Sequence, residues 1–343
     1  MKKFLNTLFV TTQGAYLNKE GEAVVVSVEK EVKLRVPIHT LGGVVCFGNV
    51  LCSPFLLGHC AENKVAVSFL TEYGRFMARV HGPVSGNVLL RREQYRKADD
   101  PVDSARIARA IVMAKAANAR TVLQRGGRDH GDKEQISALE PAIMRLGRII
   151  GEVDSLDDLD QIRGKEGDAG REYFGVLDHL ITAQKDGFHL HERSRRPPLD
   201  NMNALLSFIY TLLAHDCVGA LEAVGLDPQV GFLHRDRSGR PSLALDLMEE
   251  FRPFIADRLA LSLVNLKQVR RDGFKKTASG AVEMDDETRK TLLVTYQKRK
   301  QEEITHPYLE EKMPVGLLMY AQALLLARYL RGDIDGYPPF VWK

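Results

Sequence analysis

Cysteine is scarce in this chain, and its cysteines are not spaced as a metal or redox site. The 343 residues include 4 cysteines, which are Cys46, Cys52, Cys60 and Cys217. None of them forms a C-x-x-C pair, which excludes a zinc ribbon and a thioredoxin-like dithiol. His59 precedes Cys60 and leaves a zinc site open as an alternative. We expect free, buried thiols in a reducing compartment.

Long apolar runs are also missing. No stretch reaches the ~20 apolar residues that a bilayer-spanning helix needs. The longest candidate, Ala204 to Ala214, contains Ser207 and Tyr210, which favours a helix buried inside the protein. Near the N-terminus, the polar pair Asn6-Thr7 interrupts the apolar pattern of a secretory signal. We therefore expect a cytoplasmic protein.

A large net charge is the third absence, because 48 Lys and Arg nearly balance 45 Asp and Glu. The basic residues are nevertheless clustered, as they are in proteins that bind polyanions. A solvated helix face explains each cluster equally well, so charge alone leaves nucleic acid and solvent as open alternatives. The clusters are Arg91-Arg92 with Arg96-Lys97, Lys267 with Arg270-Arg271 and Lys275-Lys276, and Lys298-Arg299-Lys300.

Strand-forming runs fill the first part of the chain, and we expect a small, mostly antiparallel β domain over residues 1–98. Turns are expected at residues 18–21 and 29–31, and Ser53-Pro54 is typical of a capped helix start. The β-branched and apolar runs that predict strands are residues 5–10, 15–17, 23–28, 32–36, 43–47, 65–70 and 75–80.

From Asp100 the apolar residues recur with a helical period, and we expect an all-helical domain over residues 99–343. The fold class is therefore α+β. Asp100-Pro101 is typical of a helix start, and the glycine-bearing segment 125–132 predicts a polar loop. Residues 338–342 predict an ordered tail that is not helical. The expected helices are 101–123, 137–150, 167–184, 199–224, 243–266, 285–304 and 314–330.

Candidate functional groups occur in three segments of the helical domain. Glu166 is expected to open a helix and is followed by small residues at Gly167, Ala169 and Gly170, which allow a ligand to approach. The alternative is an acid that only interacts with the helix dipole. His234 ends an apolar run on a turn-rich loop, where ligands often bind. The alternative is an ordinary core histidine.

The third segment contains several acids on one helix. Asp246 lies three residues before Glu249 and four before Glu250, so either pair can share a helix face. Apolar residues surround them, and a buried carboxylate needs a partner. That partner is either a metal ion or Arg252.

Carboxylates combined with one imidazole suit magnesium or manganese, and the histidine favours manganese. A metal ion among basic clusters indicates phosphodiester chemistry. Spacing alone does not bring the three segments together in space, and the alternatives above stay open on these grounds.

Several ordered motifs across the chain nevertheless resemble one family, the Cas1 integrases of CRISPR spacer acquisition, and in detail its subtype I-C branch. The motifs are Lys165-Glu166-Gly167 with Ala169, Arg171 and Tyr173-Phe174; Arg196-Pro197-Pro198 with Asn203 to Phe208; Gly225-Leu226-Asp227-Pro228 through Gly231-Phe232-Leu233-His234; and Leu245-Asp246-Leu247-Met248-Glu249 with Phe251-Arg252-Pro253.

The resemblance implies that Glu166, His234 and Glu249 hold Mg²⁺ or Mn²⁺, with Asp246 as a further ligand or a supporting residue. The implied reaction is attack of a DNA 3′-hydroxyl on a phosphodiester at the edge of a CRISPR repeat, together with endonuclease activity. The implied partners are DNA (spacer precursor and repeat), a second copy bound through the β domain, Cas2, and a Cas4 nuclease.

Two other functions remain as alternatives to an integrase. One is a free-standing, metal-dependent DNA nuclease that acts on branched DNA, because it would use the same phosphodiester centre. The other is a non-catalytic DNA-binding scaffold, in which the acids only balance Arg252 and Lys165.

Overall fold

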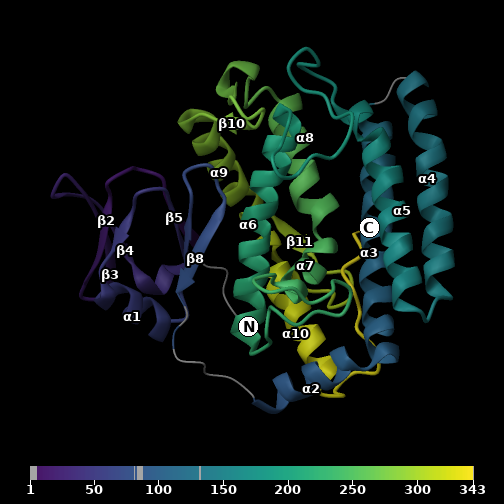
Figure 1. Ribbon diagram of the computed structural model, residues 1–343, viewed down its shortest axis with the longest axis horizontal. Helices are drawn as coiled ribbons and strands as arrows, with labels where there is room; N and C mark the ends of the chain where they lie inside the picture. The colour runs from purple at the N-terminus through teal and green to yellow at the C-terminus, as the bar shows by residue number, and fades with distance from the viewer. Residues whose placement is uncertain (1–5, 81, 83–87, 131–132, 343) are drawn as a thin grey trace. The chain divides into compact units, whose positions relative to one another are not determined.

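The computed structural model describes residues 6–80, 82, 88–130 and 133–342, and its fold class is α+β as expected (Figure 1). The chain divides into two compact units, Met1–Ser85 with Leu293–Glu302 and Gly86–Leu292 with Glu303–Lys343. This division differs from the expected boundary at 98/99, because helix α2 (Val88–Asp99) belongs to the second unit. There, the Gln94 side chain donates hydrogen bonds to the backbone of Asp227 and Val230, each at 2.8 Å.

The first unit contains two 4-stranded sheets. One sheet has the order β1 (Asn6–Val10), β5 (Leu41–Phe47), β7 (Ala66–Leu70), β8 (Phe76–Val80). The other has the order β4 (Glu31–Pro37), β3 (Ala23–Val28), β2 (Tyr16–Glu20), β6 (Leu51–Cys52). Leu17, Val24, Val44, Leu56 and Val67 are among the buried residues of their shared core.

Strand pairing in this unit is mixed rather than mostly antiparallel. β1 with β5, β5 with β7, and β2 with β6 are parallel, whereas β7 with β8, β2 with β3, and β3 with β4 are antiparallel. The helical connection α1 (Pro54–Glu62) lies between β6 and β7 and lets β7 return parallel to β5. Hairpin signals in the sequence identify only the antiparallel pairs.

Most of the helix caps and turns that the local sequence predicted in this unit are present in the structure. The Ser53 hydroxyl accepts a hydrogen bond from the Leu56 amide at 3.2 Å, which confirms the predicted cap of α1. Glu29 and Lys30 have positive φ angles, as the expected turn requires. The turn expected at residues 18–21 was misplaced, because β2 continues to Glu20 and the chain turns at Gly21 with φ 56°. Leu5, the first residue of the first expected strand, lies outside the described residues.

The C-terminal half of helix α9 (Asp286–Gln301) belongs to the β unit. Its Gln297 and Gln301 side chains donate to the Asn6 side chain, and the Lys300 ammonium donates to the Thr7 hydroxyl at 3.3 Å. Lys300 is 3% exposed. One residue of an expected DNA-binding cluster is therefore a structural residue of this unit.

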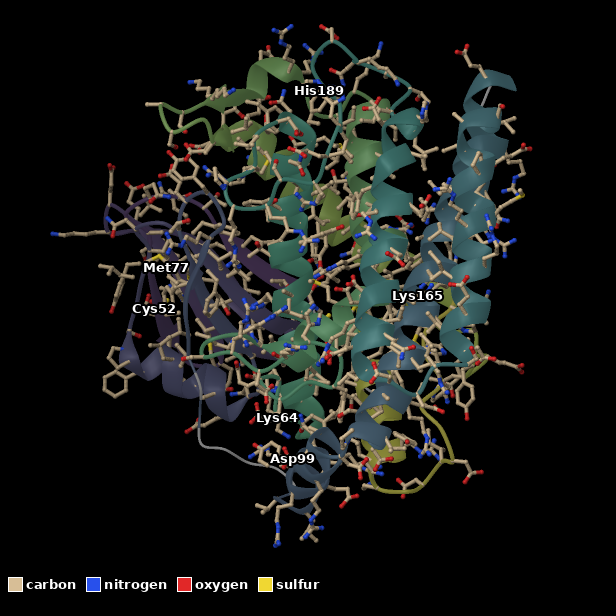
Figure 2. The ribbon with its side chains drawn as sticks, turned by 45° about the vertical axis from the view of Figure 1, so that its right-hand side comes forward. Cys52, Lys64, Met77, Asp99, Lys165 and His189 are labelled. Carbon is tan, nitrogen blue, oxygen red and sulfur yellow. The ribbon has the colours of Figure 1, made fainter. Side chains whose placement is uncertain are left out.

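The second unit is mainly helical. Helices α3 (Pro101–His130), α4 (Lys133–Asp154) and α5 (Leu159–Val176) pack against one another, and α6 (Asn201–Val224) packs against α7 (Ser242–Glu249) and α10 (Leu318–Leu330). The Asp100 carboxylate caps α3, as predicted, by accepting from the Val102 and Asp103 amides. Figure 2 labels Asp99, where α2 ends just before this cap.

Three expectations for this unit were wrong in part. Residues 125–130 continue α3 instead of forming a loop, and residues 131–132 lie outside the described residues. Gly126 lies so close to the Leu180 side chain that a Cβ atom there would be only 2.5 Å from it. The expected helix 243–266 is interrupted between α7 and α8 (Arg258–Asn265) by the π-helical turn η3 (Arg252–Asp257). The unit is also not all helical. It contains the hairpins β9 (Phe274–Lys276) with β10 (Val282–Met284) and β11 (Glu303–Thr305) with β12 (Lys312–Pro314).

Helix α6 alone, within the described part of the chain, is long and apolar enough to span a membrane by length and composition. In the structure, 61% of its most apolar window is buried inside the protein. Asp200 caps its start, and Gly225, with φ 89°, ends it. It is therefore the buried core helix that its polar residues predicted.

The four cysteines are all free thiols. Cys46, Cys60 and Cys217 are buried as expected, whereas Cys52 is half-buried. The zinc alternative gains no support, because His59 lies within ion-pair distance of Glu22 and Glu62 and forms no metal-binding group with other described residues.

Candidate active site

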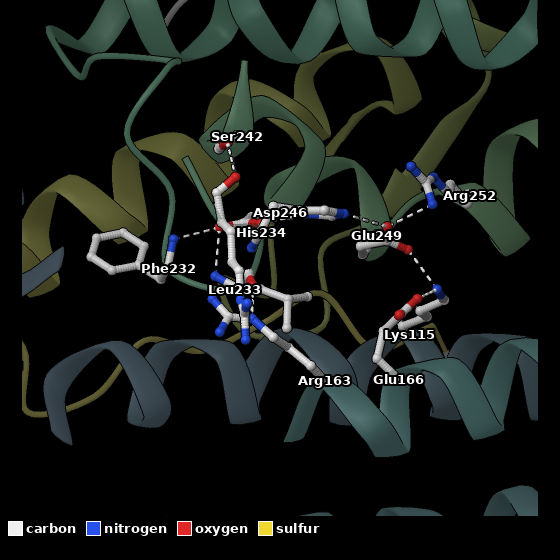
Figure 3. Close-up of polar contacts among 11 residues, drawn as sticks. Lys115, Arg163, Glu166, Phe232, Leu233, His234, Ser242, Asp246, Glu249 and Arg252 are labelled. Atoms are coloured by element: carbon white, nitrogen blue, oxygen red, sulfur yellow. Dashed lines mark hydrogen bonds and ion pairs between the residues drawn. The ribbon is translucent and has the colours of Figure 1, made fainter. Parts of the chain in front are cut away.

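Three residues that are far apart in the sequence meet in the helical unit. Glu166 comes from α5, His234 from the loop that follows α6, and Glu249 from the last turn of α7 (Figure 3). The distance from His234 Nε2 to Glu249 Oε1 is 3.7 Å. Lys115 of α3 lies between the two glutamates and forms an ion pair with each, at 2.8 Å from Glu249 Oε2. The fold therefore brings the predicted site residues together.

Glu166 was expected to open a helix, but it lies in the middle of α5. The helix begins at Leu159, because the Asp158 carboxylate accepts a hydrogen bond from the Gln161 amide at 2.8 Å and caps it. An interaction of Glu166 with the helix N-terminus is thereby excluded. Gly167, the next residue, and Gly170, one turn further on, face open space and line a cavity beside the glutamate. The small residues thus keep the approach to Glu166 open.

The loop that carries His234 is pressed against the start of α7. A Cβ atom at Gly231 would lie only 2.7 Å from Asp246 Oδ2 and 2.8 Å from the Ser242 backbone. Only glycine therefore allows this approach. Arg163 of α5 donates to the Leu233 carbonyl at 2.6 Å and fixes the loop from the other side.

Asp246 is fully buried and holds the loop in place. Its Oδ2 accepts from the Phe232 and Leu233 amides at 2.6 and 2.9 Å, and its Oδ1 accepts from the His234 amide at 2.9 Å. Oδ1 also lies 2.6 Å from His234 Nδ1. A carboxylate on Nδ1 fixes the imidazole so that Nε2 presents its lone pair, the arrangement found behind metal-bound histidines. Asp246 thus acts through His234.

Glu249 is a buried carboxylate among cations. Burial by itself would raise the pKa of Glu249, but Arg252 at 2.6 Å, Lys115 and His234 lower it to about 2. Both carboxylate oxygens lie at ion-pair distance from cations, yet neither accepts a hydrogen bond of good geometry from the described residues. The charge is stabilised while the oxygen lone pairs remain available to a ligand.

Glu250 faces the opposite way and is excluded from the site. Its Oε1 accepts from the Tyr337 hydroxyl at 2.5 Å, and its Oε2 accepts from the Phe340 amide and the Gln322 side chain at 2.6 and 3.0 Å. These bonds attach the C-terminal tail, which is ordered and not helical, as predicted. Asp246 and Glu249, three residues apart, therefore share the helix face that contacts His234.

The break after α7 positions Arg252. The π-helical turn η3 begins at Arg252 and contains Pro253, which has no amide hydrogen to continue the α-helical pattern. The Arg252 guanidinium contacts Glu249 and lies 5.1 Å from the centre of the Tyr210 ring. Arg252 is thus a partner of the Glu249 carboxylate. This agrees with one of the two alternatives from the sequence, in which either a metal ion or Arg252 is the partner of the buried acids.

Two basic residues of the site were missed in the sequence. Lys115 is a lone lysine on the buried face of an alanine-rich helix, which was a usable signal. Arg193 comes from an irregular loop, and nothing in the local sequence distinguished it. Both line a cavity of about 470 Å³, whose other lining residues include Glu166, Arg195 and Arg252. The cavity opens next to the acids and has a basic wall.

This arrangement fits a hard divalent cation in its chemistry. Glu166 and Glu249 offer oxygen, His234 offers the Nε2 nitrogen, and such sets suit Mg²⁺ or Mn²⁺. As the side chains lie, however, no three His, Cys, Asp or Glu within residues 6–80, 82, 88–130 and 133–342 form one metal-binding group. The Lys115 ammonium lies between the glutamates instead.

Comparisons with known proteins agree on one family. A sequence model described as "CRISPR associated protein Cas1" matches residues 8–298. The "CRISPR-associated endonuclease Cas1 1" of Chlorobaculum tepidum is 57% identical over 343 residues and 100% of both chains. A "CRISPR-associated exonuclease Cas4/endonuclease Cas1 fusion" of Geobacter sulfurreducens is 35% identical, over 98% of this chain and 60% of the fusion.

Solved structures share the fold. A Cas1 protein from Thermotoga maritima superposes with a TM-score of 0.82 and 22% identity over 98% of this chain and 99% of that one. A chain of a structure titled "Cas6-RT-Cas1--Cas2 complex" gives a TM-score of 0.83 at 22% identity, over 99% of this chain and 36% of that one.

Proposed function

The chain belongs to the CRISPR-associated protein Cas1 family, and on that premise we propose that it is a divalent-metal-dependent DNA integrase and endonuclease of CRISPR adaptation, of the subtype I-C branch. One observation carries the proposal. Glu166, His234 and Glu249, from three separate elements, converge beside a cavity with a basic wall.

Each residue has a distinct part in this proposal. Glu166, His234 and Glu249 would hold Mg²⁺ or Mn²⁺, which when bound would neutralise charge on a phosphodiester and lower the pKa of an attacking hydroxyl. Asp246 keeps the His234 imidazole oriented through Nδ1. Arg193 and Arg252 supply fixed positive charge to the cavity, where a DNA phosphate would bind.

The proposed reaction is a transesterification at phosphorus. A 3′-hydroxyl of the incoming DNA fragment forms a new P–O bond at the edge of a CRISPR repeat. The bond from that phosphorus to the 3′ oxygen of the repeat strand breaks. The attacking hydroxyl loses its proton and the leaving oxygen gains one. Hydrolysis at the same centre, with water as the attacking group, would account for endonuclease activity.

The partners belong to the same proposal. We infer a cytoplasmic protein that binds DNA, dimerises through the β unit, and assembles with Cas2 and a Cas4 nuclease. The fusion of Cas4 to a Cas1 relative supports the last of these. The β unit also exposes large apolar side chains, including Leu51, Phe55 and Met77, which is the property that a dimer surface requires. Figure 2 labels Met77.

In vitro strand transfer tests this function directly. The purified protein, with and without Cas2, receives a short DNA duplex, a supercoiled plasmid that carries a CRISPR repeat, and Mn²⁺ or Mg²⁺. We expect joined products at the repeat edges that disappear with EDTA. Cleavage without joining would favour a free-standing nuclease, and DNA binding without either reaction would favour a scaffold.

A matched pair of histidine variants separates chemistry from folding. His234→Ala should abolish strand transfer, because it removes the nitrogen that faces Glu249. His179→Ala, at an exposed histidine of η2 (Leu177–Leu180) in the same unit, should retain it. Equal activity of the two variants would refute the assignment of the site.

A further inference from the structure

We propose that Lys115 is the resident counter-ion of the catalytic glutamates, and that a divalent cation enters this site by displacing the Lys115 ammonium. The inference rests on the proposed function, because it concerns how the proposed metal site fills. It assigns to an α3 lysine a role that follows from its position alone: this cation already lies where the two glutamates meet.

The contacts of Lys115 carry the inference. Its ammonium donates a hydrogen bond to Glu166 Oε1 and lies 2.8 Å from Glu249 Oε2, so one cation bridges acids from two different elements (Figure 3). The side chain is only 10% exposed. Lys115 is thus a nearly buried lysine held between two carboxylates.

Charge balance explains why a cation is needed here before metal binds. Glu249 is buried and Glu166 is half-buried. Two carboxylates this close repel each other, and burial removes hydration from Glu249, so a cation between them stabilises the pair. Arg252 cannot take this place, because it contacts only Oε1 of Glu249 among the ion pairs of the described residues. Lys115 is the cation that bridges both glutamates.

Displacement follows from the same geometry. An ammonium and a divalent cation cannot occupy one point between the same two oxygens, and like charges at such distances repel strongly. Lysine has a flexible stem with a compact charge, which suits a group that must move. The cavity of about 470 Å³ that Lys115 and Glu166 both line gives the ammonium space to move away from the point between the two glutamates. Metal binding is therefore an exchange of cations, with Lys115 as competitor.

The test is the affinity of the metal-free full-length protein for Mn²⁺, measured without DNA by titration calorimetry and by the free Mn²⁺ signal in electron paramagnetic resonance. Lys115→Met removes the competitor, so Mn²⁺ should bind about tenfold more tightly or better, because it no longer displaces an ion pair. Without metal the variant should melt at a lower temperature, and saturating Mn²⁺ should raise its Tm by more than that of the wild type.

Two further variants keep the result interpretable. Lys97→Met removes a partly buried lysine of the same unit that pairs with Asp103 at 3.2 Å, and it should leave Mn²⁺ affinity unchanged. Lys115→Gln keeps a hydrogen-bond donor between the glutamates without the charge. It should also bind Mn²⁺ more tightly than the wild type, and it provides the comparison if Lys115→Met does not fold.

The outcomes distinguish this inference from the proposed function. If the wild type binds no Mn²⁺ and Lys115→Met binds none either, the proposed metal-dependent function fails, and the inference fails with it. If the wild type binds Mn²⁺ but both Lys115 variants bind it equally or more weakly, the function stands and the counter-ion role is overturned. Tighter binding in both Lys115 variants, with Lys97→Met unchanged, establishes the exchange.

Discussion

Glu249 and Glu250 are neighbours in the sequence, both are fully buried, and they have opposite environments. Glu249 faces cations, and its pKa is lowered to about 2. Glu250 faces the C-terminal tail, and burial raises its pKa to about 7 although Tyr337, Phe340 and Gln322 all donate hydrogen bonds to it. The difference shows that burial alone does not distinguish a proposed metal ligand from a structural carboxyl. Unused lone pairs next to positive charge distinguish Glu249 from a carboxyl that joins segments of the fold.

Exchanging each glutamate for glutamine gives the largest expected effect. Glu249→Gln should lower the rate of strand transfer by more than about a hundredfold, because it removes a charged proposed ligand at nearly constant shape. Glu250→Gln keeps the shape of the side chain and one of its two acceptor oxygens, away from the proposed ligands, and its rate should stay within about threefold of the wild type. The measurement is the initial rate of plasmid integration with Mn²⁺. Equal losses in both variants would show that the two acids are not functionally distinct.

The stability of the protein depends on the packing of the C-terminal tail that Glu250 attaches. Phe340 is fully buried, with ring centres 5.3 Å from Phe251 and from Phe254. Phe340→Ala should lower the free energy of unfolding by about 3–5 kcal/mol, because it removes a buried aromatic ring and leaves a cavity. Chemical denaturation measures this loss. Met144→Ala, at a side chain exposed on α4, is the control, and it should change stability by less than about 0.5 kcal/mol.

The sequence predicted which acids and which histidine form the site better than it predicted how the fold positions them. The composition of the candidate set and the Asp246–Glu249 spacing were readable, since they depend on residue types and on a helix period. Lys115 and the opposite orientation of Glu250 were not, because both depend on which helix packs against α7 and where the tail returns. The interruption at Arg252 was also missed, because the apolar period continues through a π-helical turn.

The fold shows the same limit. Caps such as Ser53 and Asp100 were predicted correctly, because the cap and its amide partners lie within three residues of each other. The return of residues 293–302 to the β unit depends on contacts between Asn6 and Gln297, almost the whole chain apart. Local chemistry predicts the ends of elements, whereas long-range packing decides to which unit an element belongs.

Asp257 extends the comparison to a third buried carboxyl, in η3. Its Oδ1 accepts from the Tyr210 hydroxyl at 2.7 Å, and burial raises its pKa to about 6 from an ordinary value of 3.8. Because the folded protein binds this proton more tightly than the unfolded chain, stability is lost as pH rises from about 3.8 to 6 and is not regained above that.

Asp257→Asn removes this titration, so the variant should gain stability relative to the wild type as pH rises from about 4 to 7, by at most on the order of 3 kcal/mol. Urea denaturation at a series of pH values measures the difference. A constant difference between pH 4 and 7 would mean that Asp257 does not titrate in this range.

The smallest expected effect tests one hydroxyl of the tail. Tyr337→Phe removes the hydroxyl that donates to Glu250 Oε1 at 2.5 Å and accepts from the Gln322 side chain at 2.9 Å, and it leaves the other two donors to Glu250 in place. Stability should fall by about 1–2 kcal/mol, because a buried carboxylate loses one hydrogen bond. Tyr308→Phe, at an exposed tyrosine, should have no measurable effect. Because Glu249 faces away from the tail, Mn²⁺ affinity should be equal in Tyr337→Phe and the wild type. A weaker affinity would show that the tail also positions the catalytic face, and the two neighbouring glutamates would then be coupled.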